Sequence, residues 1–109
     1  MKKKQHITLD IQVTNLTNTW KGDLQRLPPN QTFELIIDYP VSNPATYKIR
    51  TGKSGMGLAR LLAKIGKAYQ KVYAAEAKYG VWGHYIDDLA IEGISVDYKK
   101  KKITLDVGS

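Results

Sequence analysis

Hydrophobic and polar residues alternate along five segments of the chain, and a period of two residues is typical of strands that bury one face. The segments are "HITLDIQV" (6–13), "TFELIIDYP" (32–40), "ATYKIRT" (45–51), "DLAIEGISVDY" (88–98) and "KITLDVG" (102–108). Pro40 and Pro44 separate the second and third segments, and Ser42-Asn43 supplies turn residues between them, which predicts an antiparallel hairpin. The fourth and fifth segments, with lysines 99–102 around the turn, predict a second hairpin.

Within the fourth segment the apolar positions change from odd to even numbers. Leu89 and Ile91 are odd-numbered, whereas Ile94 and Val96 are even-numbered. One extra residue in the strand restores the side chains to a common face, and glycine tolerates the backbone conformation of such a bulge. We therefore expect a β-bulge at Glu92-Gly93.

Residues 58–73 repeat apolar side chains at a different spacing, at positions 58, 61, 62, 65, 69, 72 and 73. This spacing matches a helix of about 3.6 residues per turn. Ser54 is a candidate N-cap, whose hydroxyl would accept a hydrogen bond from a free backbone N–H, and Gly80 is a candidate left-handed C-terminal stop. The sequence predicts a helix from about Gly55 to Tyr79.

The order of the elements, β-β-β-α-β-β, predicts a single α+β domain over residues 1–109, in which one long helix covers one face of a mostly antiparallel sheet. The same order suggests a β-grasp-like arrangement. Between the first two strands, residues 15–31 are polar and contain two prolines. We expect a loop there, in which "GDLQRL" (22–27) forms at most a short helical turn.

Composition limits the classes of function and the location that we expect. The chain has no cysteine, so it carries neither a disulfide framework nor a thiolate metal site. The lysines in "MKKKQHITLDIQV" precede alternating polar residues rather than the apolar core of a signal peptide. No segment approaches the roughly 20 apolar residues that span a bilayer. We expect a cytoplasmic protein with no membrane partner and no cofactor.

Positive charge gathers on one face of the predicted helix. At about 100° per residue, five basic residues lie within an arc of roughly 60° opposite the apolar face: Arg60, Lys64, Lys67, Lys71 and Lys78. Residues 48–78 contain eight basic residues and one acidic residue, whereas the rest of the chain contains nine of each, so this region carries the whole net charge of +7. A localised surplus attracts polyanions such as the phosphate backbone of RNA or DNA. Solvated lysines on an exposed helix are the alternative explanation.

The turn "TGKSGMG" (51–57) raises the question of a phosphate-binding loop, because it joins a strand to a helix and contains Gly, Lys and Ser. A Walker A loop requires a glycine at the position that Tyr47 occupies, which argues against a nucleotide-hydrolysing loop. A single backbone phosphate could still lie at the helix start beside Arg50 and Lys53. The other explanation is that the glycines only allow a sharp turn.

The segment "YGVWGHYIDDLAIEG" (79–93) gathers aromatic and titratable residues. Trp82 and Tyr85 are candidates for stacking on nucleic-acid bases or for packing against the core. His84 could bind a metal or act as an acid/base pair with Asp87 or Asp88, but only one other histidine exists and no nucleophile with an adjacent base is evident. We therefore expect no catalytic site and no metal site.

Three hypotheses for function follow, in this order. The first is a non-catalytic nucleic-acid- or polyanion-binding module that contacts phosphates through Arg50, Lys53, Arg60, Lys64, Lys67, Lys71 and Lys78. The second is a protein-interaction or assembly module, a homo-oligomer or an adaptor. It would use the small-residue flank of the helix (Ala59, Ala63, Gly66, Ala74, Ala77) or an acidic edge formed by Asp87, Asp88, Glu92 and Asp97. The third is an enzyme that uses His84 with Asp87 or Asp88.

Overall fold

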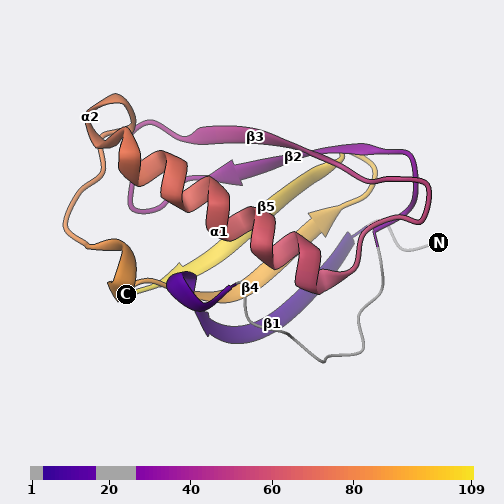
Figure 1. Cartoon of the computed structure of the whole chain (residues 1–109), viewed down its shortest axis with the longest axis horizontal. Coiled ribbons are helices and arrows are strands. Elements are labelled where there is room, and N and C mark those ends of the chain that lie inside the picture. Colours follow the sequence, from indigo (N-terminus) through magenta and orange to yellow (C-terminus); the bar gives the residue numbers. More distant parts are fainter. Residues whose placement is uncertain (1–3, 17–26) are drawn as a thin grey trace.

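The computed structural model describes residues 4–16 and 27–109 of the chain (Figure 1). These residues form a five-stranded sheet, two helices and two short 3-10 turns. The strands are β1 (Lys4–Gln12), β2 (Thr32–Ile37), β3 (Ala45–Arg50), β4 (Ala90–Asp97) and β5 (Lys102–Gly108). The helices are α1 (Leu58–Ala74) and α2 (Glu76–Tyr79), and the 3-10 turns are η1 (Val13–Asn15) and η2 (Ile86–Asp88).

The strands lie in the order β1-β4-β5-β2-β3. The predicted α+β class is confirmed, and so are both predicted hairpins, β2–β3 and β4–β5. The sheet is mixed, because β2 and β5 at its centre are parallel while the other pairs are antiparallel. Parallel neighbours need a crossover connection, and the chain between β2 and β5 includes α1. This topology is consistent with the β-grasp-like arrangement that the element order suggests, with β1 added at the edge beside β4.

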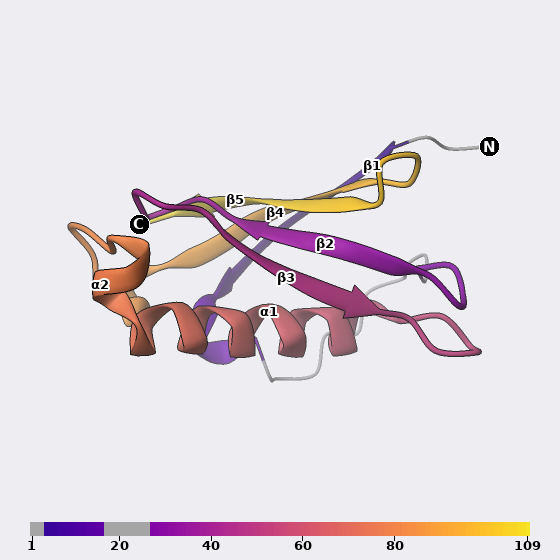
Figure 2. The ribbon, with the colours of Figure 1, turned by 90° about the horizontal axis from the view of Figure 1, so that it is seen from above.

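Helix α1 covers one face of the sheet (Figures 1 and 2). Six of its seven predicted inward positions are buried, and Tyr73 is half-buried. They pack in one core with strand residues that include Phe33, Leu35, Ile94 and Ile103. Inside the core, the hydroxyl of Tyr69 donates a hydrogen bond to the backbone oxygen of Tyr39 at 2.9 Å. Neither helix in the described residues is long and apolar enough to cross a membrane.

The long helix begins later than the sequence predicts. Gly57 is the N-cap of α1, so the prediction of Ser54 as the cap is wrong. The reason is a backbone bridge just before the helix: Leu27 and Met56 exchange N–H···O bonds of 2.7 and 3.1 Å, which holds Met56 out of the helix. The helix predicted to run to Tyr79 is also interrupted: α1 ends at Ala74, Ala75 has a φ of −125° and a ψ of 49°, and α2 follows. Helix α2 stops at Gly80, whose φ of 64° confirms the predicted left-handed stop.

Strand β4 contains the predicted bulge. Ile91 pairs with Val107 and Gly93 pairs with Asp106, so Glu92 is the extra residue on the β4 side of this ladder. A Cβ atom at Gly93 would lie 2.6 Å from Oδ2 of Asp106, which is closer than real contacts allow. Glycine is therefore suited to this position by close approach as well as by the bulge.

The small-residue flank of α1 receives part of the same chain. Leu16, which follows η1, is 1% exposed. A Cβ atom at Gly66 would lie 3.4 Å from the Cβ of Leu16, an ordinary van der Waals distance, so this segment packs directly against α1. Residues 17–26 of the predicted loop, with nearly all of its predicted helical turn, lie outside the described residues.

Candidate nucleic-acid interface

A groove lies between α1 and β3, the last strand on one side of the sheet. We call it the α1–β3 groove; its volume is about 330 Å³. It is lined by Tyr47, Lys48, Ile49, Lys64, Lys67, Ala68 and Lys71. Helix residues at i, i+3, i+4 and i+7 lie on one side of a helix, which is why Lys64, Lys67 and Lys71 reach the same groove.

Tyr47 contributes an aromatic ring to this groove. The Nζ atom of Lys71 lies 5.9 Å from the centroid of the Tyr47 ring, within the range of a cation–π contact. Burial raises the pKa of Tyr47 to about 12, and a side-chain hydrogen bond with Tyr79 contributes to the same shift. The phenol is therefore neutral at physiological pH and adds no negative charge to the groove.

A second hollow, of about 440 Å³, lies where β3 turns into α1. We call it the junction hollow; its basic lining residues are Arg50, Lys53 and Arg60. Two backbone N–H groups of the turn are already bonded within the protein: Gly55 donates to Gly52 at 3.0 Å and Met56 donates to Leu27 at 3.1 Å. These two N–H groups are therefore not available to an anion, which would meet the basic side chains of the hollow.

Positive charge dominates both hollows. Among residues 4–16 and 27–109, no carboxylate lines either of them. The salt bridge found in the described residues joins His6 to Asp106, away from both hollows, at 3.6 Å. From Arg60 to Lys71 the helix advances about 17 Å, at 1.5 Å per residue. A row of unpaired cations over this length can exchange its small counterions for the phosphates of a polyanion.

Three of the sequence-predicted residues lie apart from this surface. Lys78 belongs to α2, and its Nζ atom lies 5.3 Å from the ring centroid of Tyr79. Trp82 and Tyr85 line a different hollow together with Glu76. The structure thus brings six of the seven predicted basic residues into two adjoining hollows and leaves both predicted stacking residues outside them.

Two residues of the groove, Tyr47 and Lys48, are absent from the predicted site. The alternation in "ATYKIR" indicates that Tyr47 points toward the core, but it does not show which strand lies at the edge of the sheet. The edge position of β3 opens the ring to the groove. The residue type was the one signal in the sequence: a tyrosine at an inward strand position favours sites where its ring is packed and its hydroxyl reaches a polar environment.

The opposite face of the sheet carries charges that alternate in sign. Strand register places five charged residues in one row across the sheet: Lys4, Asp97, Lys102, Glu34 and Lys48. Side chains directly opposite on neighbouring strands have Cβ atoms about 5 Å apart, so opposite charges in such a row attract. The charge of this row is therefore partly cancelled. Its last member, Lys48, also lines the α1–β3 groove, whose other lysines (Lys64, Lys67 and Lys71) come from α1 and lie outside the row.

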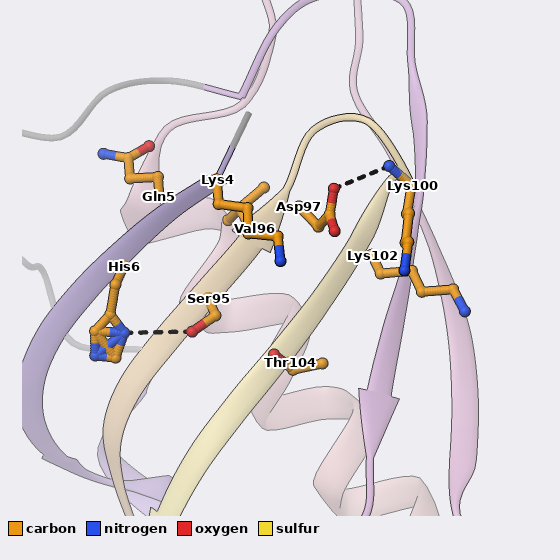
Figure 3. A pocket seen from close by; sticks show the side chains of 9 residues that line it. All are labelled: Lys4, Gln5, His6, Ser95, Val96, Asp97, Lys100, Lys102 and Thr104. Carbon is orange, nitrogen blue, oxygen red and sulfur yellow. Dashed lines mark hydrogen bonds between the residues drawn. The ribbon is translucent and has the colours of Figure 1, made fainter. Parts of the chain in front are cut away.

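Figure 3 shows the hollow on this opposite face, which has a volume of about 580 Å³. Lys4 and Lys102 flank Asp97 in register. Oδ1 of Asp97 accepts hydrogen bonds from the N–H groups of Lys99 and Lys100 at 3.1 and 3.0 Å. The N–H of Lys100 is the main cause of a lowered pKa of Asp97, so this carboxylate stays charged. A polyanion would meet this negative charge among the lysines, which makes the hollow a weaker candidate site.

His84 does not join the two aspartates with which the sequence grouped it. Its Nε2 atom lies 3.0 Å from the hydroxyl of Tyr39 and 3.3 Å from Oγ of Ser109. Asp88 instead accepts a hydrogen bond from the backbone N–H of Tyr85 at 3.1 Å. In the part of the chain that the structure describes, no group of three His, Asp or Glu side chains is arranged to hold a metal ion.

The acidic residues that suggested an assembly surface do not form one edge. Strand β4, which carries Glu92 and Asp97, lies between β1 and β5. Asp87 and Asp88 lie in η2, before the start of β4, whereas Asp97 is its last residue. At about 3.3 Å per residue, the eight residues of β4 separate them by roughly 26 Å. The prediction of an acidic edge is therefore wrong, because strand order places β4 inside the sheet.

Comparisons with protein-family models, with curated proteins and with solved structures give no match for this chain.

Proposed function

We propose that this protein binds nucleic acid through the phosphate backbone, at the surface formed by the α1–β3 groove and the junction hollow. The observation that carries the proposal is the concentration of positive charge: six predicted basic residues and Lys48 line two adjoining hollows, and none of the described carboxylates lines either hollow. Contacts from Lys and Arg to phosphates supply essentially all of the affinity in sequence-independent binding. Such contacts carry no sequence information, so the proposed role is binding without base specificity and without catalysis.

The ligand would follow the side of the molecule formed by α1 and β3. Lys64, Lys67 and Lys71 mark one line along the helix, and Arg60 continues it into the junction hollow. This line is about 17 Å long, and phosphates of one strand of a duplex follow at about 3.4 Å along its axis. About five phosphates therefore fit the line. The ring of Tyr47 in the groove gives a sugar or a base an apolar surface to pack against.

Matched charge reversals and salt dependence test the proposal. Labelled single-stranded and double-stranded oligonucleotides are titrated at about 50 and 200 mM salt with three proteins: wild type, Lys64→Glu/Lys67→Glu, and Lys99→Glu/Lys100→Glu. Both variants lower the net charge of +7 by four, but the second pair lies in the β4–β5 turn. Thermal unfolding checks that both variants fold.

If about six phosphates are contacted, wild-type affinity for duplex DNA falls about 10³-fold over this salt range. The groove variant is expected to lose at least about tenfold more affinity than the turn variant, since only it removes phosphate contacts and places carboxylates against the ligand. Equal losses in the two variants would show that net charge alone drives binding. No binding by the wild type at low salt would also overturn the proposal.

A further inference from the structure

A hollow beyond the C-terminal end of α1 exposes aromatic rings instead of lysines. We call it the aromatic hollow; its volume is about 330 Å³ and it is lined by Glu76, Val81, Trp82, Gly83, His84 and Tyr85. Trp82 is 48% exposed and Tyr85 is 78% exposed, and they are the large hydrophobic residues that stand out to solvent in the described part of the chain. An exposed indole that is also held in place is typical of a contact surface.

The ring of Trp82 is held by contacts on its inner side. Its centroid lies 5.5 Å from that of Tyr39, with the rings at 84°, and 5.9 Å from that of His84. The backbone N–H of Trp82 donates to the oxygen of Pro40 at 3.0 Å. Between the two rings Gly83 has a φ of 75°, a left-handed conformation that favours glycine. The indole is therefore a positioned surface rather than a loose side chain.

His84 is fixed in turn by hydrogen bonds at both its ring and its backbone. Nε2 lies 3.0 Å from the hydroxyl of Tyr39, which also lies 2.9 Å from Oγ of Ser109. The hydroxyl of Tyr73 donates to the backbone oxygen of His84 at 3.1 Å. These bonds link His84 to three other parts of the chain: the β2–β3 connection, α1 and the residue after β5. A ligand of this hollow would meet a preorganised site, which lowers the entropic cost of binding.

The charge of the aromatic hollow selects a cation. Glu76 is exposed on its rim and makes no salt bridge with any described residue. None of the described lysines and arginines lines the hollow. A carboxylate beside an indole attracts a cation both by its charge and through the negative face of the ring. The same carboxylate repels phosphates, which disfavours the stacking of nucleic-acid bases on Trp82.

We propose that the aromatic hollow binds an arginine side chain from a different protein, with the guanidinium stacked on Trp82 and paired with the carboxylate of Glu76. Arginine fits better than lysine because its planar, weakly hydrated group stacks on a ring and forms two parallel hydrogen bonds with a carboxylate. A second copy of this chain is a poorer source, since two molecules that each carry +7 repel one another. This site is independent of the nucleic-acid surface.

The test uses the full chain labelled with ¹⁵N and three probes: the peptide Gly-Gly-Arg-Gly-Gly with blocked ends, the same peptide with lysine, and the same peptide with citrulline. Citrulline keeps the shape of arginine without its charge. The NMR signals followed are the indole N–H of Trp82, identified by its loss in Trp82→Phe, and the amide of Gly83. Glu76→Gln is compared with Glu92→Gln, a matched change on the opposite face of the sheet.

We expect saturable shifts at Trp82 and Gly83 with the arginine peptide, weaker shifts with lysine and none with citrulline. Glu76→Gln should weaken binding about three- to fivefold, in the range of an exposed ion pair, and Glu92→Gln should leave it unchanged. Trp82→Leu should weaken it by a similar factor. The Lys64→Glu/Lys67→Glu variant should bind the peptide as the wild type does.

Four results would overturn the proposal. The first is equal binding of the citrulline peptide, and the second is an equal effect of Glu76→Gln and Glu92→Gln. The third is a shift at Trp82 with an oligonucleotide but not with the arginine peptide, which would assign the ring to base stacking. The fourth is a concentration-dependent dimer in sedimentation that Glu76→Gln abolishes, since the occupant would then be a second copy.

Discussion

The α1–β3 groove and the aromatic hollow differ in how the sequence builds them. The basic side chains of the groove come mainly from one helix, at positions that its period of 3.6 residues places on one side. The aromatic hollow depends on residues from distant segments: Tyr39 follows β2, Trp82 follows α2 and Ser109 follows β5. The groove therefore depends on local periodicity and charge, whereas the hollow depends on long-range packing.

The two surfaces also carry opposite local charge, which separates their proposed ligands. A phosphate chain is attracted to Lys64 and Lys67 and repelled by Glu76, and a guanidinium group shows the reverse preference. Repulsion of the wrong ligand contributes to specificity as much as attraction of the right one. Added salt should weaken ligand binding mainly at the groove. Changes to the buried residues that hold Trp82 and His84 should weaken ligand binding mainly at the hollow.

The largest expected effect comes from a residue of the hydrophobic core on which α1 packs. Leu62 in α1 is fully buried, with 0% exposure. Leu62→Ala should lower the free energy of unfolding by about 2 to 5 kcal/mol, because it removes buried methyl groups and leaves a cavity. Chemical denaturation measures the change, with Gln70→Ala on the exposed side of α1 as a control expected within about 0.5 kcal/mol of the wild type. A change below about 1 kcal/mol would contradict this packing.

The next-largest effect should lower stability and weaken ligand binding at the aromatic hollow but not at the groove. Tyr69→Phe removes the hydroxyl that donates to the backbone oxygen of Tyr39, at 2.9 Å, and takes this bond from a partly buried acceptor. The free energy of unfolding should fall by about 0.5 to 1.5 kcal/mol. Because Tyr39 supports the ring of Trp82, binding of the arginine peptide should weaken, while oligonucleotide binding should stay the same. Equal losses at both surfaces would show that they are not independent.

The same tyrosine gives a prediction at alkaline pH. Burial first, and then the charge of Asp38, raise the pKa of Tyr69 above its ordinary value. An unfolded tyrosine ionises near pH 10, so above that pH the folded state binds more protons than the unfolded state. The stability of the wild type should therefore fall as the pH rises past about 10, and Tyr69→Phe should show a shallower fall. Identical slopes for the two proteins would contradict the burial of this phenol.

A smaller effect is expected from reversing the charge of the aromatic hollow. Glu76→Lys should abolish the binding of the arginine peptide, because it replaces attraction with repulsion. From Lys71, the groove lysine nearest in sequence, Glu76 is five residues along the chain, about 7.5 Å at a helical rise, which is close to the screening length of about 8 Å at physiological salt. Oligonucleotide affinity should therefore rise by less than about threefold. A larger gain would place part of the nucleic acid over the hollow.

The sequence could predict the features that depend on local periodicity, as the groove does, but not those that depend on contacts between distant segments, as the hollow does. The strands, the bulge at Glu92 and the inward face of α1 follow from local periodicity, and the structure confirms them. The row of lysines along α1 follows from the same period. The start of α1 was misplaced because Met56 pairs with Leu27, which is 29 residues away along the chain. A candidate cap residue in the sequence cannot show that a neighbouring residue pairs with a distant segment of the chain.

Strand order was the second kind of information that the sequence lacks. It makes β3 an edge and so opens Tyr47 to the groove, and it places β4 inside the sheet. The hydrogen bonds of His84 to Tyr39 and Ser109 join residues 45 and 25 positions apart. The local cluster of His84 with two aspartates was therefore misleading, because proximity in sequence is not contact in the fold.

The smallest expected effect lies on the opposite face of the sheet and serves as a reference for both surfaces. The N–H of Lys100, together with that of Lys99, lowers the pKa of Asp97, so the folded carboxylate stays charged at a lower pH than the unfolded one, which titrates near 3.9. This contribution to stability is present above about pH 4 and is lost as the pH falls through the folded value. Asp97→Asn should therefore lower the unfolding temperature slightly at pH 7, and the difference from the wild type should shrink in acid.

Both ligands should bind the variant as they bind the wild type, because Asp97 lines neither surface. A pH-independent difference would instead mean that the turn depends on the shape of the side chain rather than on its charge.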